Sequence, residues 1–270
     1  MRQLVNKIRR YLKLYFHLVK FSLMTVFVYR INSLLMGFTP IIWMLSAVSL
    51  LYVIFGSTKQ IAGWNFWELT FLLGVHELIY LLSWLTFVGN LLGFIRWVEQ
   101  GKFDITLLRP VNHRFFVSFN SVDLSGCLGG VFNTVVLISL SLSKLNLKIS
   151  SLQILIFIFS LVISYLIFYF LVFLLSSLCL YWVKAESFID WLLESTDFDH
   201  YPAEIYSDWL RFFLFFFLPI LFFSYVPTAI LLGKLPSYYA IFGVIIVVWL
   251  YLISTVVWRL GLRHYQSASS

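Results

Sequence analysis

The apolar positions of this chain fall into long, unbroken runs. These runs cover residues 26–55, 66–95, 117–143, 151–183, 210–232 and 238–259. Each run exceeds the roughly 20 apolar residues that a helix needs to cross the hydrocarbon core of a bilayer. Transmembrane β-strands would instead alternate between apolar and polar positions over about 10 residues. The pattern therefore predicts an all-α polytopic membrane protein with six transmembrane helices, folded as one transmembrane domain over residues 1–270.

Residues 1–28 show the pattern of an amphipathic helix. Two faces repeat at helical spacing, one apolar (Leu4, Ile8, Tyr11, Tyr15 and Leu18) and one basic (Arg10, Lys13, His17 and Lys20). A helix of this kind lies in the headgroup layer of the membrane and is attracted to anionic lipid. A cleaved signal peptide is the alternative, but the following apolar run continues past Pro40 to Phe55, which does not fit a short signal core.

Two interpretations of the fifth span remain open. In one, the apolar run 210–232 is the fifth span, although two prolines interrupt it. In the other, the fifth span runs from near Trp182 to near His200, and residues 203–232 fold as a broken, re-entrant helical hairpin on the outer side. A membrane tolerates irregular backbone of this kind where protein or a water-filled cavity covers it. Both interpretations leave the C-terminus on the inner side.

Composition and charge support a membrane location and predict an orientation. Hydrophobic residues make up 61% of the chain and charged residues 11%, whereas a soluble domain has about 25% charged residues. The net charge of +7 comes from basic residues at the ends of the apolar runs rather than from a nucleic-acid-binding patch. Thirteen lysines and arginines fall on the side of the termini and four on the other. Since the more basic side is usually cytoplasmic, we expect both termini in the cytoplasm and no nucleic-acid partner.

The connection between the second and third runs is the most distinctive segment. Residues 96–114, RWVEQGKFDITLLRPVNHR, mix charged residues with apolar ones such as Phe103, Leu107 and Leu108, and Gly101 and Pro110 bracket a short helical stretch. An amphipathic helix of this kind can lie across the membrane surface and dock into a groove of a partner protein. An ordinary amphipathic connector is the alternative interpretation.

A few ionisable residues lie within the predicted spans, where they are energetically unfavourable and often functional. His76 and Glu77 lie in the second run, and Asp123 lies near the inner end of the third. They could line a transport path or a dimer interface, or they could be hydrogen-bonded pairs that fix the rotation of helices. Two pairs of glycines, Gly89–Gly93 and Gly126–Gly130, have the spacing that lets membrane helices approach closely.

Catalytic motifs are absent from the sequence. It contains no GxxxxGK[ST] loop, so this chain has no Walker A segment to hold a nucleotide. His76–Glu77 begins like the zinc motif HExxH, but position 80 is Tyr. Cys127 and Cys179 are far apart and match no metal or redox spacing. We therefore expect a non-enzymatic chain with no catalytic, cofactor-binding or metal-binding residues.

Three stretches resemble one transporter family in their motifs and order. They are EQGKFDITLLRPV (99–111), HYPAEIYSDWLRFFLFFFLPILFFSYVPTAILLG (200–233) and GLRHYQSAS (261–269). Together they resemble permeases of the type-2 ABC exporter superfamily, and they are most similar to its six-span bacterial branch. The resemblance implies that residues 1–28 form an interfacial connecting helix and that residues 203–232 form an outer re-entrant hairpin.

The resemblance also implies specific residue roles. The segment that couples to the ATPase would comprise Glu99, Gly101, Asp104, Leu107, Leu108, Arg109 and Pro110. The re-entrant hairpin would depend on Tyr201, Pro202, Pro219, Tyr225 and Pro227.

The same resemblance implies partners and a location. Two permeases would pair, as a homodimer or heterodimer, on a dimer of ABC ATPase subunits in the bacterial cytoplasmic (inner) membrane. ATP and Mg²⁺ would bind to the ATPase and not to this chain. Export of a hydrophobic or amphipathic substrate is the expected function. A membrane-embedded lipid-modifying enzyme and a secondary transporter are the alternatives.

Overall fold

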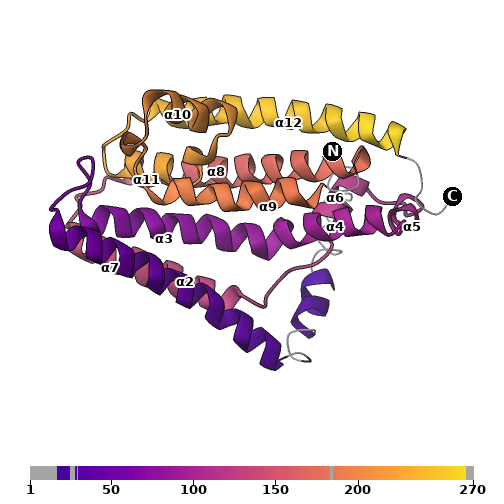
Figure 1. Ribbon diagram of the computed structural model, residues 1–270, viewed down its shortest axis with the longest axis horizontal. Helices are drawn as coiled ribbons and strands as arrows, with labels where there is room; N and C mark the ends of the chain where they lie inside the picture. Colours follow the sequence, from indigo (N-terminus) through magenta and orange to yellow (C-terminus); the bar gives the residue numbers. More distant parts are fainter. Residues whose placement is uncertain (1–16, 25–27, 29, 183–184, 266–270) are drawn as a thin grey trace.

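The computed structural model describes residues 17–24, 28, 30–182 and 185–265, and these form a bundle of helices (Figure 1). Within them, the only extended pairing is a single bridge between Ile61 and Trp64. The all-α prediction is therefore confirmed for the described part of the chain. Most of the amphipathic helix predicted over residues 1–28 lies outside the described residues, although residues 17–24 are helical.

Five stretches of helix are long and apolar enough to cross a membrane. They are Ser33–Ser57, Phe66–Glu99, Cys127–Leu145, Ser151–Leu180 and Tyr238–His264. The first belongs to α2 (Arg30–Ser57), and the second is a continuous rod of α3 (Phe66–Ser83), η1 (Trp84–Val88) and α4 (Gly89–Glu99). The others are α7 (Cys127–Leu145), α8 (Ser151–Ser177) with η2 (Leu178–Leu180), and α12 (Tyr238–His264). The chain is a multi-pass membrane protein, with five such helices in its described part rather than the six expected.

A sixth pass along the bundle is made by a shorter helix. The end of α8 lies beside the end of α12, where the Tyr181 hydroxyl donates to the Val257 carbonyl at 3.0 Å. The start of α12 lies beside the start of α3, where Lys234 pairs with Glu68 at 3.1 Å. The chain must therefore return between α8 and α12, and α9 (Glu186–Ser195) with η3 (Thr196–His200) makes this return. At 1.5 Å per residue, α9 alone spans only about 15 Å, half the hydrocarbon thickness.

The two ends of the bundle carry different structures (Figure 1). One end, the α5 end, holds α5 (Phe103–Leu107), α6 (His113–Phe119) and the C-terminal turn of α12. The other, the α11 end, holds the broken segment 203–232. This segment consists of η4 (Ala203–Ile205), α10 (Asp208–Phe212), η5 (Phe213–Phe217), η6 (Ile220–Phe222) and α11 (Tyr225–Leu231). The alternative in which 210–232 is one spanning helix is therefore wrong.

The third apolar run begins as helix later than its pattern predicts. Residues 117–143 are not continuous, because α6 ends at Phe119 and α7 starts at Cys127. The Asn90 side chain accepts hydrogen bonds from the Ser121 amide at 3.1 Å and the Ser121 hydroxyl at 2.6 Å. It also donates to the Ser121 carbonyl at 2.8 Å. Because the Asn90 side chain pairs with the N–H and the C=O of Ser121, this residue needs no helical hydrogen bonds, and the helix can be interrupted here.

Glycines bring α7 close to its neighbours, as one of the two predicted pairs anticipates. A Cβ on Gly129 would overlap the Gly37 backbone oxygen of α2, and a Cβ on Gly130 would lie 2.8 Å from the Leu81 side chain of α3. Gly89 and Gly93 have open space at their Cβ positions in the described structure. Of the predicted pair Gly126–Gly130, Gly130 therefore packs closely against α3, whereas a Cβ on Gly126 would have no neighbour closer than 3.9 Å. The close contact with α2 is made by Gly129, which belongs to neither predicted pair, and the pair Gly89–Gly93 makes no close contact in the described structure.

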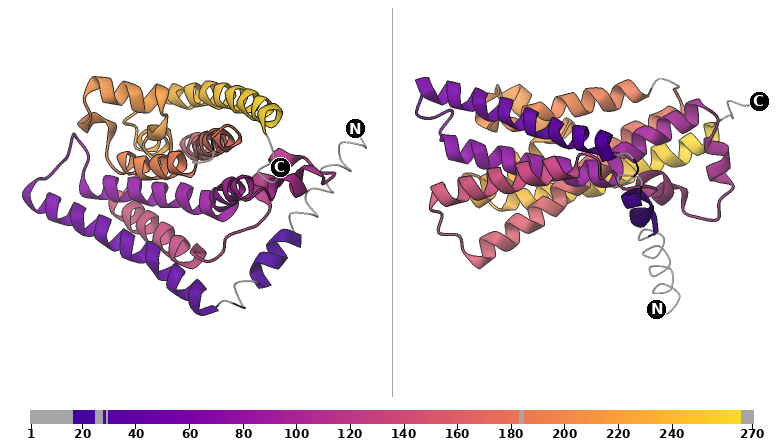
Figure 2. Two further views of the ribbon diagram at one scale, coloured as in Figure 1. Left: turned by 45° about the vertical axis from the view of Figure 1, so that its right-hand side comes forward. Right: turned by 90° about the horizontal axis from the view of Figure 1, so that it is seen from below.

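The outer helices present apolar side chains to their surroundings. In both figures α2 and α12 lie on opposite sides of the bundle, with α3 and α8 between them (Figures 1 and 2). Trp43 and Tyr52 of α2 are 71% and 74% exposed, and Ile245 of α12 is 60% exposed. The solvent that such surfaces fit is lipid or an apolar partner.

Candidate functional site

The connection after α4 is a compact turn at the α5 end of the bundle. It begins at Gly101, whose φ of 68° is in the left-handed region that glycine enters without strain. The five-residue helix α5 follows, and Asn112 then caps α6 by accepting a hydrogen bond from the Phe115 amide at 3.0 Å. The short helical stretch predicted between Gly101 and Pro110 is therefore present.

α5 has one buried face and one exposed face. Phe103 and Thr106 are buried, and Leu107 is half-buried against the core. On the opposite face Ile105 is 61% exposed and Leu108 is 86% exposed. Large apolar side chains at such exposure, on a helix that is itself anchored, fit either lipid or an apolar partner.

The buried face enters an aromatic cluster that joins four helices. The Phe103 ring lies 5.1 Å from Phe94 of α4, 6.3 Å from Trp258 of α12 and 5.4 Å from Tyr265, measured between ring centroids. Trp258 in turn lies 5.3 Å from Phe173 of α8. Edge-to-face contacts such as these add to the area that the rings bury. A displacement of α5 therefore acts directly on α4 and α12, and on α8 through Trp258.

A polar neighbour supports the same junction. Burial, together with the nearby Asp104 carboxylate, raises the pKa of Tyr265 to about 12. The Tyr265 hydroxyl is therefore protonated at neutral pH and faces Asp104 as a potential donor. Asp104 belongs to α5 and Tyr265 follows α12, so both groups lie where these two helices meet.

The remaining residues of the predicted coupling segment lie on the surface of the α5 end. Glu99, Arg109 and Pro110 are exposed. The Arg109 guanidinium carbon lies 4.8 Å above the Phe116 ring, a cation–π contact that holds its charge close to the exposed apolar residues of α5. The structure thus brings the predicted coupling residues into one surface region, with Leu107 turned inward.

At the α11 end, Asp199 holds the broken segment against α3. Its Oδ1 accepts from the Tyr225 amide at 3.1 Å, at the start of α11, and its Oδ2 lies 3.6 Å from His76 Nδ1. The Ser224 hydroxyl donates to the Asp199 carbonyl at 3.0 Å. The His200 ring lies 4.2 Å from that of His76. A carboxylate at the first amides of a helix satisfies donors that the helix itself leaves unpaired.

The residues predicted for the re-entrant hairpin lie in or next to the broken segment 203–232, most of them where one helical piece begins. Pro202 precedes η4, Pro219 precedes η6, and both are buried. Pro227 is the third residue of α11, where a missing N–H removes no helical hydrogen bond. The Tyr225 hydroxyl donates to Glu204 at 2.7 Å. The prolines therefore mark the breaks between helical pieces, and Tyr201, half-buried, leads into the first of them.

The three ionisable residues predicted to line a transport path or a dimer interface do not share one site within the chain. His76 faces Asp199, whereas Glu77 faces α7 and accepts from the Asn133 amide at 3.3 Å. Asp123 is exposed in the connection before α7, where its amide donates to the Leu85 carbonyl at 3.2 Å. Leu85 is more than two helical turns from His76.

Two features escape the sequence analysis. Asn90 and Asn133, both buried, pair with backbone groups on other segments. Arg114 reaches α12 and donates to the Thr255 hydroxyl at 2.8 Å. Contacts over such separations leave no local sequence pattern. Among the described residues, no group of three His, Cys, Asp or Glu side chains could hold a metal ion.

Comparison with known proteins gives one family. The sequence model of that family, described as ABC-2 family transporter protein, matches residues 41–269, which include every described helix from α3 to α12. A search of curated proteins and a search of solved structures each returned no match. The match covers most of the chain and agrees with the resemblance in the three quoted stretches and with the several apolar helices of the bundle. This chain belongs to the ABC-2 family of transporter proteins and is a multi-pass membrane permease.

Proposed function

We propose that this chain is the permease subunit of an ABC exporter and that a separate dimer of ATPase subunits drives it. Two permeases pair in the cytoplasmic membrane of a bacterium, with both termini of each chain in the cytoplasm. ATP and Mg²⁺ bind to the ATPase, where phosphoryl transfer takes place. The cargo is hydrophobic or amphipathic, which fits a chain with 20% aromatic residues.

The division of α5 into two faces is the observation that carries this proposal. Ile105 and Leu108 project away from the bundle, while Phe103 is fully buried against rings of α4 and α12 and the ring of Tyr265. A partner that binds the exposed face can therefore move α4 and α12 through Phe103, and α8 through the contact between Trp258 and Phe173. A subunit without a nucleotide site needs such a contact, because the motion driven by ATP must reach it from a partner subunit.

The movement itself is a change between two packings of the helices. ATP binding biases the ATPase dimer toward its closed state, and the permease follows because the two states bind the closed dimer with different affinity. The five-residue π-helix η1 joins α3 to α4 in the middle of the second span. Segments of this kind are frequent at functional sites in long helices, so η1 is the proposed joint.

The sixth pass completes the membrane topology. α9 with η3 is the fifth span, residues 203–232 are the re-entrant hairpin that shields it, and residues 1–28 are the connecting helix. Asp190 and Glu194 are exposed on α9. Carboxylates inside a membrane face protein or a water-filled cavity rather than lipid. This face of α9 therefore belongs to the seam between the paired permeases, and the cargo passes along that seam.

Copurification tests the proposal. A tagged copy of the chain, solubilised from membranes of its own host, is expected to bring down an ATPase with a Walker A motif and magnesium-dependent ATP hydrolysis. The double variant Ile105→Asp/Leu108→Asp is expected to lose the ATPase while still inserting into the membrane.

Leu152→Asp is the matched control. Leu152 is 66% exposed at the far end of the bundle, in the first turn of α8, where a carboxylate suits the helix dipole. This variant is expected to retain the ATPase. Equal retention by the α5 double variant, or absence of any ATPase with the unmodified chain, would refute the proposed function.

A further inference from the structure

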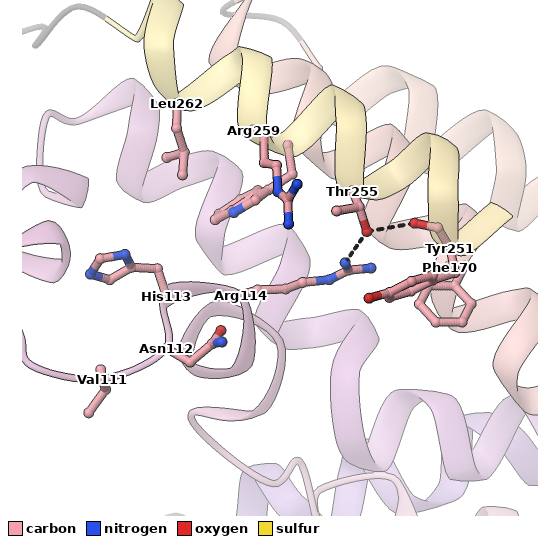
Figure 3. Close-up of a pocket in the computed structure, with 10 residues that line it drawn as sticks. Val111, Asn112, His113, Arg114, Phe170, Tyr251, Thr255, Arg259 and Leu262 are labelled. Atoms are coloured by element: carbon pink, nitrogen blue, oxygen red, sulfur yellow. Dashed lines mark hydrogen bonds between the residues drawn. The ribbon is translucent and has the colours of Figure 1, made fainter. Parts of the chain in front are cut away.

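A cavity at the α5 end of the bundle holds two arginines. It has a volume of about 520 Å³ and lies between the start of α6, the C-terminal half of α12 and Phe170 of α8 (Figure 3). Arg114 enters it from α6 and Arg259 from α12. None of the described residues that line it is an aspartate or a glutamate.

Arg114 is held in place by neutral groups. Its guanidinium donates to the Thr255 hydroxyl at 2.8 Å and to the Ser254 hydroxyl at 3.0 Å. The guanidinium carbon also lies 4.3 Å from the centre of the Phe173 ring and 5.4 Å from that of Tyr251. These contacts fix the plane of the group and use two of its five N–H donors. The charge is thus preorganised but not neutralised.

Arg259 adds a second positive charge to the same space. Figure 3 shows its guanidinium extending from α12 toward the guanidinium of Arg114. Two like charges in a partly buried pocket repel each other more strongly than in water. An anion between them removes this repulsion, and a phosphate suits guanidinium groups best because its oxygens accept paired N–H bonds.

The other half of the pocket and its surroundings are apolar. Tyr251, Trp258 and Leu262 of α12 line it together with Phe170. Beside them, the outer face of α12 exposes Leu252 and Val256, each at 55%. A cationic recess that opens onto an apolar helix face matches a molecule with an anionic head and a hydrocarbon tail. Basic pockets between spans are known to bind the headgroups of anionic lipids.

We propose that this pocket binds the phosphate group of an anionic phospholipid, with an acyl chain lying along the exposed face of α12. Such a lipid bridges α6 and α12. It does so next to Trp258, which contacts Phe103 of α5. Bound lipid therefore stabilises the packing of α5 against the bundle. The proposal concerns this chain alone and does not depend on the ATPase partner.

Lipid binding to the purified chain tests the proposal. Native mass spectrometry in detergent compares retention of phosphatidylglycerol with that of phosphatidylcholine, and thermal unfolding is followed with each lipid and with inorganic phosphate. Phosphatidylglycerol is expected to bind at least about tenfold more tightly than phosphatidylcholine, the scale of a lost hydrogen bond to a charged group. It is also expected to raise the unfolding temperature at concentrations at which inorganic phosphate has no effect.

Variants locate the site. Arg114→Gln/Arg259→Gln is expected to abolish the preference for phosphatidylglycerol, and Arg259→Gln alone, on an exposed side chain that leaves folding intact, is expected to weaken it about tenfold. Arg263→Gln removes an exposed arginine of the same helix that does not line the pocket, and is expected to change nothing. Undiminished preference in Arg259→Gln would overturn the proposal. So would protection by inorganic phosphate equal to that by phosphatidylglycerol, because the ligand would then be a free anion.

Discussion

At the scale of single residues, Phe103 is the link between the surface of the α5 end and the interior. Its side chain is fully buried, although it belongs to a five-residue helix with exposed apolar residues on its other face. The rings around it come from segments that are far apart in the sequence, Phe94, Trp258 and Tyr265. Phe103 therefore joins α5 to α4 and α12, on the same face of α5 as the buried Thr106.

Shortening this side chain is expected to loosen α5. Phe103→Ala removes a buried ring and should lower the free energy of unfolding by about 3–5 kcal/mol, because a cavity remains where the ring was. Leu108→Ala, on the exposed face, should change it by about 0.5 kcal/mol or less. Thermal unfolding of the purified chain in one detergent measures both. Equal effects of the two substitutions would mean that Phe103 is not the anchor.

At the scale of elements, the close contact between α2 and α7 depends on a glycine. Gly129 faces the backbone of Gly37, so no side chain fits between the helices there. Gly93 on α4 has the same residue type in a helix with open space around it. Comparing substitutions at these two positions separates the effect of close helix packing from the general effect of glycine on helix stability.

Alanine at these two glycines is expected to act in opposite directions. Gly129→Ala should destabilise the chain by about 1–3 kcal/mol, because α7 must move away from α2. Gly93→Ala should be neutral or stabilising by about 0.5–1 kcal/mol, since alanine favours helix. Unfolding temperatures of both variants decide the point. Destabilisation by Gly93→Ala would show that α4 has a neighbour that the described chain does not provide.

Much of this arrangement could be predicted from the sequence. Five of the six apolar runs contain spanning helices, since helix formation in a membrane follows directly from the length of apolar sequence. The predicted start of the third span is wrong, because the Asn90 side chain there accepts the hydrogen bond of the Ser121 amide and the helix is interrupted. Burial of Phe103 could not be predicted, because its partners lie on other helices.

At the scale of the whole molecule, the described helices place α5, α6 and the end of α12 together at one end of the bundle (Figure 1). Among the described residues, five lysines and arginines are exposed at this end (Arg96, Lys102, Arg109, Arg259 and Arg263) and three at the other (Lys59, Lys144 and Lys148). The excess of positive charge at the α5 end favours the cytoplasmic side for it. The proposed function requires this orientation, because only then could a cytoplasmic ATPase reach α5.

Cysteine labelling tests the orientation. With Cys127 and Cys179 replaced by serine, single cysteines at Lys102 and His264 are expected to react with a membrane-impermeant thiol reagent only after spheroplasts are opened. Single cysteines at Lys59 and Lys148 are expected to react in intact spheroplasts. The reverse pattern would place α5 on the outer side, beyond the reach of an ATPase.

The most direct measurement of the central claim is photo-crosslinking from position 108 in living cells. A photoreactive amino acid in place of Leu108, which is 86% exposed on α5, is predicted to form a covalent adduct with a Walker-motif ATPase. The same amino acid in place of Leu152 is predicted to form none. An ATPase adduct from position 152, or none from position 108 when the complex is intact, would contradict the claim that α5 is where the chain receives its driving force.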